Sequence, residues 1–123
     1  MANFKEETRN QITELINNGI LPKTPEIDTV YFRLGYGADK TSGPYPKYVQ
    51  RGGLYIDWEE AAKALNRTGN NPWEYNNGYG SQAYEGWITF KGSNVWLERA
   101  EYDGSEWWEV RRKPTLDSKE GDE

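Results

Sequence analysis

Asp103-Gly104 lies between two segments in which apolar and polar residues alternate, and this arrangement constrains the fold more than any other feature. Asp-Gly in such a context is typical of a two-residue type I′ β-hairpin turn, and the turn sets the register of both strands. The predicted cross-strand pairs are Tyr102 with Ser105, Ala100 with Trp107, Arg99 with Trp108, Glu98 with Glu109, and Leu97 with Val110.

A second hairpin precedes the first, with Lys91-Gly-Ser-Asn94 as its turn. A four-residue turn pairs Phe90 with Val95 and Ile88 with Leu97. The two hairpins together form a three-stranded antiparallel meander. Because side chains alternate between the faces of a strand, one face of the meander collects large apolar residues and is the predicted core face. These residues are Ile88, Phe90, Val95, Leu97, Trp108 and Val110.

The predicted register places two pairs of like charges opposite each other, Glu98 with Glu109 and Glu101 with Glu106. Each pair is unfavourable by some tenths of a kcal/mol, so about 0.5 kcal/mol. A three-residue turn would separate the charges but would move Glu109 to the core side. Burial of that charge costs more than the repulsion it removes, so the two-residue turn is favoured.

The second face of the meander is also rich in aromatic residues. One interpretation is that the 67–85 segment or a helix covers this face and forms a second small core. The other is that part of it is an exposed patch, which in a monomer marks a binding surface. The residues predicted to contact a partner, with two tyrosines of the loop, are Trp87, Trp96, Glu98, Tyr102, Trp107, Glu109, Tyr75 and Tyr79.

The rest of the chain predicts two helices and one further strand. Apolar residues recur at helical spacing over 3–18 and 57–65, and Asn3 and Asp57 have the form of N-terminal caps. Residues 29–35 alternate as a strand does. The predicted fold is α+β: an antiparallel sheet of about four strands with both helices packed on one face. The predicted strands are 29–35, 87–91, 95–102 and 106–112.

Two segments read as irregular. Glycine and proline interrupt residues 36–53, and residues 67–85 consist mainly of Asn, Gly, Tyr and Ser, a composition typical of an adaptable recognition loop. We expect a single domain over 1–116, followed by a disordered acidic tail over 117–123. The tail holds four acids and one lysine and so contributes −3 to the net charge of −5.

The chain contains neither histidine nor cysteine. It therefore lacks the commonest general base, thiol chemistry and the usual zinc ligands. Glu98 and Glu109 could serve as an acid–base pair, but two surface carboxylates on a hairpin are commoner. We expect no enzyme activity, no metal and no cofactor. No apolar run has the length of a membrane span and no export signal is visible, so a cytoplasmic location is expected.

Basic and aromatic residues interleave between positions 33 and 51, as in proteins that hold single-stranded nucleic acid. The candidate contacts are Arg33, Tyr36, Lys40, Tyr45, Lys47, Tyr48 and Arg51. The acidic net charge argues against this interpretation.

The sequence favours a non-enzymatic module that binds another protein. Its specific form is a phage or mobile-element accessory protein that inhibits a host nuclease or defence complex. The alternative is a module that binds single-stranded nucleic acid or glycans.

Overall fold

The structure, a computed structural model, describes residues 1–39, 44–78 and 80–114. It has mixed helix and strand content, with two antiparallel sheets. Lys40, Tyr79 and the predicted tail 117–123 lie outside the described residues. The elements are β1 Ala2–Asn3, α1 Phe4–Asn17, β2 Ile27–Leu34, β3 Lys47–Arg51, α2 Trp58–Ala64, β4 Glu74–Tyr75, β5 Tyr84–Phe90, β6 Val95–Tyr102 and β7 Ser105–Arg112.

The main sheet has five strands in the order β3-β2-β5-β6-β7, so the predicted number of four is wrong. The added strand is β3, which pairs antiparallel with β2 inside the segment predicted to be irregular. β1 and β4 form a separate two-stranded ribbon. Strand β5 begins at Tyr84, three residues earlier than predicted, because it pairs with β2 over its whole length.

The predicted hairpin register is confirmed along β6 and β7, from Tyr102 opposite Ser105 to Leu97 opposite Val110. Asp103 and Gly104 have φ angles of 54° and 87°, the left-handed values that a type I′ turn requires. Ile88 lies opposite Leu97, also as predicted. The Asp-Gly signal and strict alternation were sufficient to define this half of the sheet.

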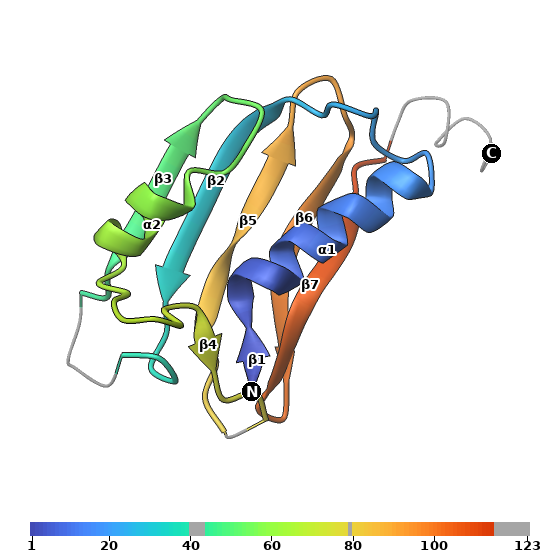
Figure 1. Cartoon of the computed structure of the whole chain (residues 1–123). Coiled ribbons are helices and arrows are strands. Elements are labelled where there is room, and N and C mark those ends of the chain that lie inside the picture. Colours follow the sequence, from blue (N-terminus) through green and yellow to red (C-terminus); the bar gives the residue numbers. More distant parts are fainter. Residues whose placement is uncertain (40–43, 79, 115–123) are drawn as a thin grey trace.

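Both helices begin at the predicted caps. The Asn3 side chain accepts a hydrogen bond from the Glu6 amide at 3.0 Å, and Asp57 accepts one from the Glu60 amide at 3.1 Å. Each cap satisfies a backbone N–H that has no partner within its helix. Figure 1 shows α1 and α2 over the same face of the five-stranded sheet, with α1 crossing β6 and β7 and α2 beside β3 and β2.

Aromatic rings fill the space between the helices and the sheet. Phe4 of α1 stacks on Tyr84 of β5 with ring centroids 4.0 Å apart, and it meets Phe32 edge to face at 5.0 Å. Trp73 and Trp108 pack around Phe4 at 5.8 and 5.7 Å. Such ring pairs stabilise the fold by about 0.5–1.5 kcal/mol each, in addition to the stabilisation from burying their apolar surface. They therefore supply core stability in a chain with few aliphatic residues.

Five of the six residues predicted for the core face of the meander are buried, and Val110 is not. Val110 is 39% exposed. It lies near the end of β7, which is an edge strand and has a neighbour on one side only. The prediction that Val110 is buried is therefore wrong. Alternation assigns the side chain to a face of the sheet, but it does not show how much of that face other elements cover.

Gly86 lies where β5 passes closest to β2. Its φ angle is 143°, and a Cβ atom there would lie 1.9 Å from the carbonyl oxygen of Tyr31. We predict that Gly86→Ala lowers the free energy of unfolding by about 2–3 kcal/mol, because both the backbone angle and the contact become strained.

Gly92→Ala is the matched control, because Gly92 also has a positive φ but no atom lies within 4 Å of its added Cβ. This change should cost about 1 kcal/mol. Urea unfolding of both variants measures the difference, and equal losses would contradict the predicted backbone clash.

Candidate functional site

The candidate functional site is the face of the five-stranded sheet that points away from both helices, here called the outer face. Among the described residues, no helix lies over it (Figure 1). Its members alternate with the residues of each strand that point toward the helices. They are Lys47, Val49, Arg51, Thr29, Tyr31, Arg33, Glu85, Trp87, Thr89, Trp96, Glu98, Ala100, Tyr102, Ser105, Trp107, Glu109 and Arg111.

The described part of the 67–85 segment forms no second core on the outer face. Trp73 and Tyr75, which it carries, are buried on the opposite side, among the rings beneath the helices. Trp87 and Trp107 remain 42% and 39% exposed, and Tyr102 is 76% exposed. Of the two interpretations of this face, the structure agrees with the exposed aromatic patch.

Trp87 occupies the middle of the outer face. Its ring stacks on Tyr31 of the neighbouring strand, with centroids 4.5 Å apart and ring planes 27° from parallel. Trp87 and Glu98 together line two hollows, one of about 360 Å³ toward Glu85 and one of about 460 Å³ toward Thr89. A rigid ring pair between two hollows has the geometry of an anchor residue at a binding surface.

The acids on β6 and β7 have partners that reduce the predicted repulsion. Glu98 accepts a hydrogen bond from the Trp96 indole nitrogen at 3.1 Å, and a Glu109 oxygen lies 4.0 Å from an Arg111 nitrogen. Glu101 accepts a hydrogen bond from the Gly104 amide at 2.9 Å. The like-charge pairs of the predicted register are therefore present, with neighbours that offset their cost.

The basic residues and the tyrosines of the 33–51 segment do not all lie on one face of the sheet. Arg33, Lys47 and Arg51 lie on the outer face, and Arg33 forms an ion pair with Glu85 at 2.5 Å. Tyr48 lies on the helix side, where its ring packs near Phe32, so it does not belong to the same surface. This segment was predicted to be irregular, but residues 47–51 form strand β3. Neighbouring side chains in a strand point to opposite faces, so Lys47 and Tyr48 lie on different sides of the sheet. Tyr36 is exposed and Tyr45 half-buried in the connection before β3.

Tyr75 was predicted to contact a partner, and this is wrong because its side chain is only 5% exposed. Its hydroxyl donates a hydrogen bond to Glu7 at 2.8 Å and accepts one from Arg99 at 3.1 Å. The tyrosine thus joins β4 to α1 and β6 inside the protein.

A buried ion pair beneath the outer face escaped the sequence prediction. Arg99 and Glu106 are 2.6 Å apart, and both side chains are completely buried. Glu106 also accepts hydrogen bonds from the amides of Ala83 and Tyr84, at 2.6 and 3.0 Å. Alternation from Leu97 already placed Arg99 on the core face, and this was the signal that could have revealed the pair.

The pair is surrounded by further favourable contacts. The Arg99 guanidinium lies 5.1 Å from the Phe4 ring centre and 5.2 Å from that of Trp108, within the range of cation–π attraction. It also lies 3.4 Å from Glu7 of α1. These contacts connect the β6–β7 hairpin, which presents Trp107 and Tyr102, to the helix and to the start of β5.

We predict that Arg99→Met lowers the free energy of unfolding by about 3–5 kcal/mol, because Glu106 is left completely buried without its cationic partner. Arg33→Met is the matched control: the Arg33–Glu85 pair is partly exposed, so its loss should cost below about 1 kcal/mol. Urea unfolding measures both. If the two variants lose the same free energy of unfolding, the buried pair contributes no more to stability than the partly exposed one.

Stability should also decline at high pH. Burial raises the pKa of Tyr75 and the pKa of Tyr84, so the folded protein holds these phenolic protons more tightly than the unfolded chain does. Their contribution is complete below the ordinary tyrosine pKa of about 10 and falls above it by up to about 1.4 kcal/mol per pH unit for each tyrosine.

Unfolding measured at pH 8 and pH 11 should therefore show a smaller loss in Tyr75→Phe than in the wild type. Tyr102→Phe removes an exposed hydroxyl and is the control. A pH-dependent loss that is the same in all three proteins would exclude Tyr75 as a source.

Comparison of the chain with known protein families, curated proteins and solved structures finds no match. Within the described ranges, no helix is long and apolar enough to cross a membrane. The same residues include no cluster of three or more carboxylates that could hold a metal ion. The arrangement of the outer face is therefore the main source of functional inference.

Proposed function

We propose that the protein is a non-enzymatic module that binds another protein through its outer face. One observation carries the proposal: an uncovered sheet face presents exposed tryptophans among charges of both signs. Aromatic residues and arginine are enriched where proteins bind each other. The size of the face also suits this use. Five strands about 4.8 Å apart, the longest of eight residues at about 3.3 Å each, span at most about 600 Å², near the roughly 800 Å² of a typical half-interface.

The distribution of charge supports a protein partner. Arg33, Lys47 and Arg51 lie at the β2–β3 end of the outer face, while Glu98 and Glu109 lie on β6 and β7. Trp87 lies between the two groups. A surface for nucleic acid is uniformly basic, whereas a face with separate basic and acidic parts can match a protein of complementary pattern.

The specific partner we propose is a nucleic-acid-processing complex of a host cell, which this protein would inhibit as a phage or mobile-element accessory protein. Glu98 and Glu109 flank exposed tryptophans and could pair with the arginines and lysines of a nucleic-acid channel. If this is correct, addition of the protein should lower the affinity of the partner complex for nucleic acid.

The proposal is tested by truncation of two exposed rings, Trp87→Ala and Trp107→Ala. Each change should weaken partner binding by about 2 kcal/mol or more, because rings at the centre of an interface dominate its affinity. The free energy of unfolding should change by less than about 1 kcal/mol, since neither ring is part of the core. Capture from host lysate followed by titration of the captured protein measures the effect.

Tyr55→Ala is the matched control, because Tyr55 is 80% exposed and lies outside the outer face. It should leave capture unchanged. If the tryptophan variants capture the partner as well as the wild type does, the outer face is not the binding surface. A large loss of stability would instead place the rings in a structural role.

A second candidate is binding of single-stranded nucleic acid. The structure favours it by bringing Arg33, Lys47 and Arg51 onto the same face as the Tyr31–Trp87 ring pair. Rings that stack on bases beside cations are the usual means of such binding. The affinity would then fall steeply with added salt, whereas an aromatic-anchored protein contact would change little.

A further inference from the structure

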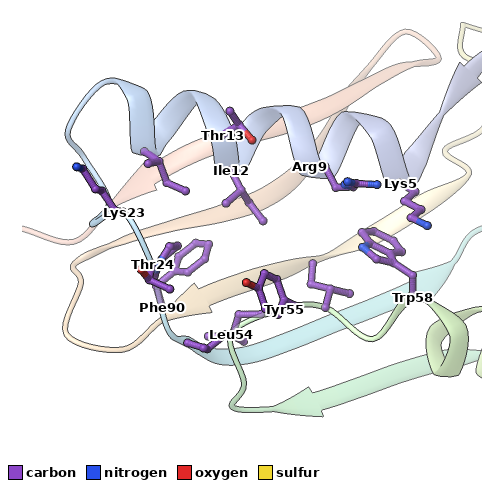
Figure 2. Close-up of a pocket in the computed structure, with 14 residues that line it drawn as sticks. Lys5, Arg9, Ile12, Thr13, Lys23, Thr24, Leu54, Tyr55, Trp58 and Phe90 are labelled. Atoms are coloured by element: carbon purple, nitrogen blue, oxygen red, sulfur yellow. The ribbon is translucent and has the colours of Figure 1, made fainter.

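A groove runs along α1 on the helix side of the sheet, opposite the outer face. One wall is the exposed side of α1, and the other consists of residues 23–25 and 54–56 with Trp58. Ile27 and Phe90 form the floor. The groove has a volume of about 410 Å³, and Figure 2 shows its lining side chains between the helix and the opposite loop.

The interior of the groove is apolar because the predicted apolar stripe of α1 is only partly covered. Phe4 and Leu15 are buried against the sheet, whereas Ile12 and Ile16 remain half-buried and face the groove. Tyr55, on the facing wall, is 80% exposed. Apolar surface of this kind beside an exposed ring marks a site for an apolar ligand.

Cations stand at both ends of the groove. Lys5 and Arg9, one helical turn apart, lie near Trp58, and Lys23 lies at the far end (Figure 2). In the part of the chain that the structure describes, no carboxylate lines the groove and none of these three cations forms an ion pair. In a chain of net charge −5, such a set of cations is complementary to a negatively charged ligand.

The length and the lining of the groove favour one class of ligand. From Lys5 to Ile16 the helix rises about 16 Å, so the groove suits an elongated molecule. Cations at its ends and apolar side chains between them match a ligand with an anionic head and an apolar body. A hydrocarbon chain brings no amides that need hydrogen-bond partners along the apolar side chains, whereas an extended peptide does.

We propose that the groove binds a long-chain carboxylate. The hydrocarbon chain lies along Ile12, Ile16 and Phe90, and the carboxylate lies at the Lys5–Arg9 end. A guanidinium and an ammonium one turn apart can both donate to one carboxylate, and hydrogen bonds between charged groups are stronger than neutral ones. The site is independent of the outer face, because it lies on the other side of the sheet.

Isothermal titration with dodecanoate, below the concentration at which it forms micelles, tests the proposal on the full chain. Dodecanoate should bind at about one molecule per chain, and the neutral analogue dodecanol should bind at least about tenfold more weakly. The double variant Lys5→Glu/Arg9→Glu should also lose at least about tenfold in affinity for dodecanoate. Lys5 lies in the first turn of α1, where an acidic residue is favourable, and Arg9 is exposed, so this variant should fold.

The double variant Arg112→Glu/Lys113→Glu is the charge-matched control, since both residues are exposed and neither lines the groove. Trp107→Ala is the control for the outer face. Both controls should bind dodecanoate as the wild type does. The proposal is overturned if no binding is detected. It is also overturned if dodecanol binds as tightly as dodecanoate, or if reversal of the two cations has no effect. Loss of dodecanoate binding in Trp107→Ala would move the site to the outer face.

Discussion

The completely buried pair of Arg99 and Glu106 is the interaction on which the arrangement of the protein depends. Removal of two charges from water costs several kcal/mol for each, and one ion pair rarely recovers this cost by itself. Here the Glu106 carboxylate also accepts two backbone N–H groups at the start of β5, and Arg99 reaches Tyr75 and Glu7. The pair thus fixes the relative positions of α1, β4, the start of β5 and the β6–β7 hairpin, which are distant in sequence.

The tryptophans divide equally between the two sides of the sheet. Trp58, Trp73 and Trp108 join the ring cluster under the helices, where Phe4 and Tyr84 stack at its centre. Trp87, Trp96 and Trp107 lie on the outer face. The first group supplies most of the apolar contact of a core with few aliphatic residues. The second group is not required for that contact, since both helices, Trp73 and Tyr75 pack on the other side.

Features decided by neighbours in sequence could be predicted, and features decided by distant contacts could not. Asp103-Gly104 and alternation defined the register of β6 and β7, and the caps at Asn3 and Asp57 located both helices. Strand β3 was missed because glycines and prolines surround it and its partner β2 lies across a long connection. Tyr75 and Tyr84 are buried in contact with Arg99 and Glu106, which lie far from them in the sequence. Alternation places Arg99 on the core face but does not identify these partners.

For the candidate site, alternation placed Trp87, Trp96 and Trp107 on one face, but it could not show whether that face was covered. The structure leaves it open, with Glu98 and Glu109 among the rings. An antiparallel sheet with one face in water usually has polar side chains there. Exposed rings on such a face favour self-association, and interspersed charges oppose it. Such charges limit aggregation while the rings stay accessible, as the proposed binding of another protein requires.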